Sequence, residues 1–70
     1  MGWCSGTEVF DSVAGYVLDS NLTGEQKYDV LRQLANALEW QDWDCQSDSM
    51  YWDHPIVQRI FRELHPSWDF

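Results

Sequence analysis

The stretch "TGEQKYDVLRQLANALEW" (Thr23–Trp40) decides the fold, because it carries the clearest helical signal in the chain. Thr23 with Gln26 three residues later forms a capping-box pattern, and Leu22 before the cap fits a hydrophobic staple. Apolar residues then recur at helical spacing along one side: Val30, Leu31, Leu34, Ala35, Ala37 and Leu38. This pattern predicts an amphipathic helix with one face in a core, and we expect the helix to continue to about Asp42.

A second helix is expected before this stretch and a third after it. Ser5 with Glu8 makes another capping-box pattern. It precedes an apolar stripe formed by Val9, Phe10, Val13, Ala14, Val17 and Leu18. The third helix is expected to begin at Pro55, with Asp53 or His54 as its N-cap, and to end before Pro66. Its stripe comprises Ile56, Val57, Ile60, Phe61 and Leu64.

These signals predict an all-α fold, a small three-helix bundle in which residues 1–70 form one domain. An aromatic, acidic loop is expected between the second and third helices. The composition is 44% hydrophobic and 16% aromatic, with five Trp, which is too apolar for a disordered chain. A core built from 70 residues is small, so association with a second copy is an open way to cover its aromatic residues.

The charge balance excludes two classes of partner. Twelve acidic residues against four basic ones give a net charge of −8, which argues against direct nucleic-acid binding and against docking on an anionic membrane. The same charge favours attraction to basic partners. The simpler interpretation, that the acidity only keeps the protein soluble, stays open.

The cysteine content and the N-terminus indicate a cytoplasmic protein. Two cysteines, Cys4 and Cys45, are too few for a disulfide-rich secreted scaffold. No apolar run is long enough to span a bilayer, and the start lacks the basic and apolar regions of a signal peptide. "MGWCSG" is similar to a myristoylation start, but Gly6 stands where Ser or Thr is required. We therefore expect free thiols and no lipid anchor.

The stretch "EWQDWDCQSDSMYWDH" (Glu39–His54) carries the candidate binding site. No Lys or Arg lies between Arg32 and Arg59, and Trp and Tyr are enriched at the energetic centres of interfaces. The predicted contact face comprises Glu39, Asp42, Trp43, Asp44, Asp48, Trp52 and Asp53. In the alternative interpretation, the aromatic residues close the core and the carboxylates only solvate the loop. Trp40 and Cys45 are the residues of this stretch that we expect in the core.

Residues of this stretch, with Cys4 and His65, match three kinds of chemical site only in part. Cys4, Cys45, His54 and His65 are ligand types that zinc prefers, but no two of them form a short-spaced clip. Asp42, Asp44, Gln46, Asp48 and Asp53 match five positions of a calcium-binding EF-hand loop, but Ser47 replaces its glycine and Asp53 its glutamate. A catalytic pair of Cys4 or Cys45 with His54 lacks any family signature. We expect no enzymatic activity and no cofactor.

The segments "MGWCSGT", "DWDCQ" and "DHP" together resemble a family of small acidic proteins encoded by phages and prophages. The resemblance implies a protein made in the cytoplasm of an infected bacterium, and it carries over no catalytic residues. Small acidic phage proteins often inhibit host enzymes or antiviral defence systems, several of them by imitating the charge of nucleic acid. The leading hypothesis is a non-enzymatic inhibitor of a host protein with a basic surface. The alternative is a small metal-binding or assembly protein that uses Cys4, Cys45 and His54.

Overall fold

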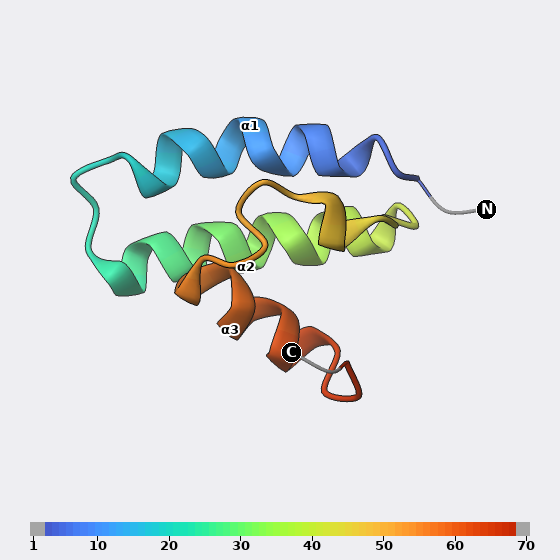
Figure 1. Cartoon of the computed structure of the whole chain (residues 1–70). Coiled ribbons are helices and arrows are strands. Elements are labelled where there is room, and N and C mark those ends of the chain that lie inside the picture. Colours follow the sequence, from blue (N-terminus) through green and yellow to red (C-terminus); the bar gives the residue numbers. More distant parts are fainter. Residues whose placement is uncertain (1–2, 69–70) are drawn as a thin grey trace.

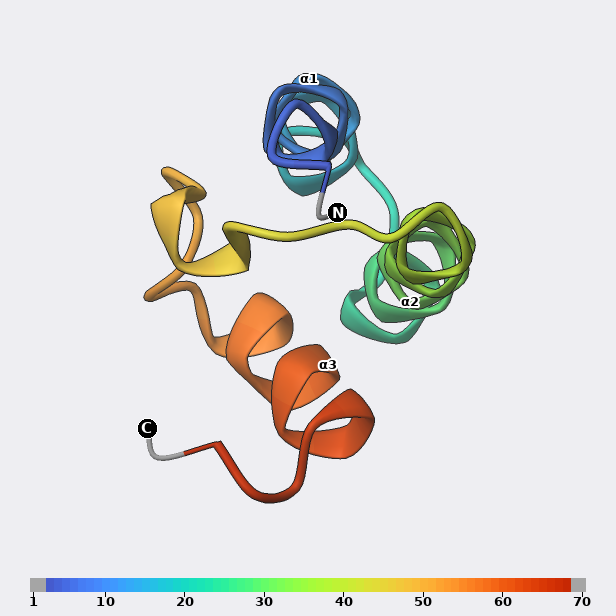
Figure 2. The same cartoon turned by 90° about the vertical axis from the view of Figure 1, so that its right-hand side faces the viewer.

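Three α-helices form the body of the protein, and the computed structural model describes residues 3–68. The elements are α1 (Gly6–Leu18), α2 (Gly24–Trp40), the short 3-10 helix η1 (Gln46–Asp48) and α3 (Pro55–Leu64). α1 and α2 run side by side in opposite directions, and α3 packs against α2 at an angle (Figure 1). Figure 2 shows segment 41–48 leaving α2 and crossing between α1 and α3. The described residues contain no strand, so the predicted all-α three-helix fold is confirmed.

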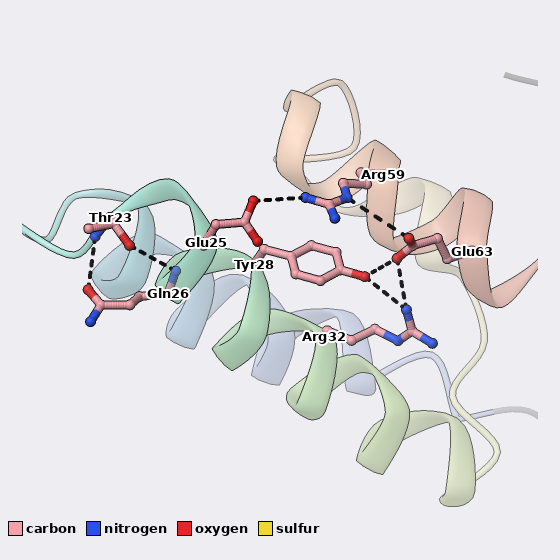
Figure 3. A network of polar contacts seen from close by, with 7 residues as sticks. All are labelled: Thr23, Glu25, Gln26, Tyr28, Arg32, Arg59 and Glu63. Carbon is pink, nitrogen blue, oxygen red and sulfur yellow. Dashed lines mark hydrogen bonds and ion pairs between the residues drawn. The ribbon is translucent and has the colours of Figure 1, made fainter.

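Two of the predicted helix starts are confirmed in atomic detail. The hydroxyl of Thr23 accepts the backbone N–H of Gln26 at 3.1 Å, and the Gln26 side chain accepts the N–H of Thr23 at 3.0 Å (Figure 3). This reciprocal capping box satisfies two backbone donors that the first turn of α2 would otherwise leave unpaired. At α3, Nδ1 of His54 accepts the N–H of Ile56 at 3.2 Å, and Pro55 occupies the first helical position.

Two details of the predicted helices are wrong, although α1 does begin directly after Ser5 as expected. The side chain of Ser5 makes no capping hydrogen bond, because the backbone of Ser5 is already in the right-handed helical region rather than the extended region that a capping side chain requires. α2 ends at Trp40 and does not continue to Asp42. The reason for the earlier end lies in the turn that follows the helix.

α2 ends in a Schellman motif that reverses the direction of the chain. Asp42 adopts a left-handed conformation with φ of 62°. Its N–H donates to the carbonyl of Glu39 at 3.1 Å, and the N–H of Trp43 donates to the carbonyl of Leu38 at 3.0 Å. These two bonds define the motif, which usually has glycine at the left-handed position. The turn directs Trp43 back toward the interior.

The core consists mostly of residues from the three predicted stripes. The buried hydrophobic side chains are Phe10, Ala14, Val17, Leu31, Ala35, Leu38, Trp43, Val57, Ile60 and Phe61. Val9 and Val30 belong to the predicted stripes but are 39% and 42% exposed. On each helix, the side chains that are buried occupy a narrower part of the helix surface than the apolar residues do. The tail after α3 also packs: Trp68 lies against Trp52 at 6.1 Å between ring centroids.

Trp43 is the one core residue among the described residues that comes from outside the α-helices. Its ring centroid lies 5.1 Å from that of Phe10 on α1 and 5.5 Å from that of Phe61 on α3. Its indole N–H donates to the hydroxyl of Thr7 at 3.1 Å, so the buried polar atom is satisfied. The segment after α2 thus supplies the ring that packs between α1 and α3.

The fit between Trp43 and Gly6 gives the first prediction. A Cβ atom on Gly6 would lie 2.5 Å from Cδ1 of the Trp43 ring, whereas a Cβ on Gly24 would meet nothing within 4 Å. We expect Gly6→Ala to lower the free energy of unfolding by about 1–3 kcal/mol, because the buried ring would have to shift. Gly24→Ala is the control and should be neutral or slightly stabilising. Equal urea midpoints for the two variants would contradict this packing.

Candidate partner-binding surface

The start of the described chain lies beside the segment that follows α2 (Figure 1). The N–H of Trp3 donates to the carbonyl of Asp42 at 2.6 Å, and the N–H of Asp44 donates to the carbonyl of Trp3 at 3.2 Å. This pairing forms an isolated parallel β-bridge between Trp3 and Trp43. We use the name acidic end for Trp3 together with the acidic and aromatic exposed or partly buried residues of the last turn of α2 and of segment 41–48, which are Glu39, Trp40, Asp42, Asp44 and Asp48.

The carboxylates of the acidic end fall into two groups. Asp42, Asp44 and Asp48 are exposed. Glu39 is partly buried, and its carboxylate accepts the Gln46 amide at 3.0 Å and contacts Nε2 of His65 at 2.7 Å. Glu39 therefore links α2 to the segments around it, whereas the three aspartates are exposed to solvent. Asp53 is exposed as well, but it lies on the separate turn before α3.

Two of the predictions for tryptophan are wrong. Trp43, predicted as a contact residue, is only 4% exposed, because the turn after α2 returns it to the core. Trp40, predicted as a core residue, is 81% exposed. Trp40 lies two positions beyond the buried Leu38, which places it about 200° around the helix from that residue. Extending the helical spacing from the buried stripe would have identified Trp40 as exposed.

The other predicted aromatic contact, Trp52, is half-buried and packs on Phe61 at 5.4 Å and on Trp68 at 6.1 Å. Only part of its ring can face a partner. Trp3, which the sequence did not single out, is 38% exposed and lies against the acidic segment. Trp40 and Trp3 are therefore the accessible tryptophans of the acidic end.

Two open hollows flank the turn at residues 42–44. The first has a volume of about 360 Å³ and is lined by Asn36, Glu39, Trp40 and Asp42. The second has a volume of about 510 Å³ and is lined by Asp44, Cys45, Gln46, Ser47, Trp52, Ser67 and Trp68. Each hollow combines an indole with a carboxylate, which is a suitable environment for an Arg or Lys side chain.

The basic residues lie on other parts of the molecule. All four belong to α2 and α3: Lys27, Arg32, Arg59 and Arg62. Arg32 pairs with Glu63 at 2.8 Å, and Arg59 lies 4.0 Å above the Tyr28 ring (Figure 3). α1 and segment 41–54 contain no Lys or Arg. Segment 41–54, which carries Asp42, Asp44 and Asp48, therefore has no Lys or Arg of its own to offset its negative charge.

Cys4 and Cys45 form a disulfide, so the expectation of free thiols is wrong. The two cysteines are 41 positions apart, and no pattern in the sequence predicts that they meet. Thr7 supports the pair: its N–H donates to the carbonyl of Cys4 at 3.0 Å, and its hydroxyl donates to that of Cys45 at 2.8 Å. Because disulfides are rare in a reducing cytoplasm, the bridge does not support the predicted location, where the same residues would carry thiols.

The predicted zinc ligands are not brought together as a set. His54 caps α3, and His65 contacts Glu39 while its ring stacks on Trp68 at 3.7 Å. Within residues 3–68, the potential metal ligands that cluster are instead Cys4, Asp44 and Cys45. The Cys–His catalytic pair has no thiolate while the disulfide is formed.

The predicted calcium loop is also changed by the turn. Gln46, one of its five expected ligands, is buried, and its amide donates to Glu39 and to the carbonyl of Trp43, both at 3.0 Å. This side chain is thus part of the packing beneath the loop.

No family model matches the chain, and no curated protein or solved structure matches it either. The resemblance to small phage proteins therefore stays a prediction. Across residues 3–68, no helix combines the length and the apolar character that crossing a membrane requires.

The disulfide gives the second prediction. It closes a loop across a sequence separation of 41 residues, for which the chain-entropy model gives about 4 kcal/mol of stabilisation. A reductant should lower the free energy of unfolding by roughly that amount, measured by urea denaturation. The Cys4→Ser/Cys45→Ser variant is the control and should not respond to the reductant. Identical curves for the wild-type protein in both conditions would show that the bridge contributes nothing.

Proposed function

We propose that this protein binds a basic surface of another protein through the acidic end and blocks that surface by occupying it. The target would be a nucleic-acid-handling or antiviral defence enzyme of a bacterial host. The observation that carries the proposal is Trp40, which is 81% exposed and lines a hollow with Glu39 and Asp42. A large aromatic side chain in this position offers apolar area that a partner can bury.

The charges around Trp40 favour a basic partner over a neutral one. The exposed carboxylates of Asp42, Asp44 and Asp48 lie on segment 41–54, which contains no Lys or Arg. Charged groups at the rim of an interface raise the association rate and select partners of opposite charge. An acidic rim around an aromatic contact therefore fits a surface rich in Lys and Arg.

Proteins present such surfaces mainly where they bind phosphates. Exposed carboxylates can pair with the same Arg and Lys side chains, so the acidic end would compete with nucleic acid for the groove. The resemblance to small phage proteins supports the choice of a host enzyme as the target. A non-enzymatic role is favoured because the candidate nucleophiles are joined in the disulfide and His54 is engaged at the start of α3.

The test is capture of partners from a bacterial lysate on the immobilised protein. The proposal predicts that a captured protein is retained at low salt and lost at high salt, because exposed charge pairs are screened. Short duplex DNA added at low salt should also release it. A partner that stays bound in the presence of excess DNA would contradict competition for a nucleic-acid groove.

Matched variants locate the surface. Asp42→Asn/Asp48→Asn should weaken retention at least about tenfold, because it removes two charges that pair with the partner. Trp40→Ala should do the same, because it removes the aromatic contact. Asp19→Asn/Asp29→Asn removes the same charge from exposed positions outside the acidic end and should retain the partner as the wild-type protein does. Equal losses for the two double variants would show that only net charge matters, and the acidic end would then be the wrong surface.

A further inference from the structure

We propose that Cys4, Asp44 and Cys45 form a zinc site when the disulfide is reduced. Each residue offers one ligand atom, and these atoms all lie within 4.8 Å of one another. The proposal concerns a chemical state of this chain and does not depend on the binding function proposed above. It also differs from the ligand set expected from the sequence, because Asp44 replaces both histidines.

The ligand types suit zinc. Zinc takes four ligands in a tetrahedron, with bonds of about 2.3 Å to thiolate sulfur and about 2.0–2.2 Å to carboxylate oxygen. Neighbouring ligand atoms are then roughly 3.6–3.8 Å apart. The Cα atoms of Cys4 and Cys45 are 5.1 Å apart, which leaves both sulfurs within reach of one ion. Two thiolates select zinc over magnesium or calcium, and water would complete the coordination.

The backbone holds the three residues together without the sulfur–sulfur bond. Thr7 donates to the carbonyls of both cysteines, and the bridge between Trp3 and Trp43 places Cys4 next to Asp44. None of these bonds involves a sulfur atom. Reduction therefore removes the covalent link and leaves the contacts that position the ligands.

Asp44 is itself fixed in place. Its Oδ1 accepts the N–H of Cys45 at 2.8 Å, so the carboxylate is oriented by a hydrogen bond, as ligating carboxylates in metal sites usually are. Cys4 and Asp44 are exposed and Cys45 is partly buried, so an ion can reach all three. The surrounding acidic end attracts a cation.

A dithiol reductant gives two electrons and two protons to the disulfide, which becomes two thiols, and the reductant becomes a disulfide. Zinc binding then releases the two thiol protons to water as the thiolates coordinate. The disulfide and the metal are therefore mutually exclusive. In either state, Cys4 is joined to segment 44–45.

The test uses the full chain, reduced under an inert atmosphere, with Zn²⁺ in a calorimetric titration and Co²⁺ as a spectroscopic substitute. The proposal predicts one ion per chain, sulfur-to-cobalt charge-transfer bands, and a higher melting temperature of the reduced protein when Zn²⁺ is added. The oxidised protein should bind neither ion at this site. Absence of stoichiometric binding, or binding without the sulfur bands, would overturn the proposal.

Variants identify the ligands. Asp44→Asn should weaken Zn²⁺ binding at least about tenfold, and Cys45→Ser by more, because each removes an ion-binding atom. Asp29→Asn removes the same charge from an exposed aspartate outside the cluster and the acidic end, and it should stay within about twofold of the wild-type affinity. Should Cys45→Ser fail to fold, the comparison of the two aspartate variants decides. Equal affinities for Asp44→Asn and Asp29→Asn would overturn the role of Asp44.

Discussion

The burial of Trp43 is the constraint on which the rest of the structure depends. Its ring packs between Phe10 on α1 and Phe61 on α3, and its N–H is satisfied by the Thr7 hydroxyl. This position requires space that only a glycine leaves at residue 6, and it requires the chain to turn sharply after α2. In a chain of 70 residues, one large aromatic side chain supplies a substantial share of the available core.

The same packing creates the acidic end. With the ring of Trp43 directed inward, its neighbours Asp42 and Asp44 are exposed, and the bridge to Trp3 brings the first described residues alongside. The two cysteines then meet next to Asp44. The candidate binding surface and the proposed metal site thus both depend on one turn and one buried ring. A substitution that shifts Trp43 should therefore also shift the exposed residues of the acidic end.

The helices could be predicted because their signals are local. Helical spacing located the stripes, and the cap at Thr23 and the proline at position 55 located two of the helix starts. The segment after α2 could not be predicted in this way, since Asp42 takes a left-handed turn position that usually belongs to glycine. That turn returned Trp43 to the core, whereas the exposure of Trp40 follows from its place on α2, about 200° around the helix from the buried Leu38. The disulfide depends on the distance between residues 41 positions apart, which only the fold determines. The exposed aspartates were anticipated because charge resists burial.

The central claim is that two tryptophans three positions apart have opposite roles, and urea denaturation of two alanine variants tests it most directly. Trp43→Ala should lower the free energy of unfolding by about 3–5 kcal/mol, as expected for loss of a buried aromatic side chain. Trp40→Ala should change it by less than about 0.5 kcal/mol, because its side chain is exposed. Similar losses for both variants, or a larger loss for Trp40→Ala, would contradict the account.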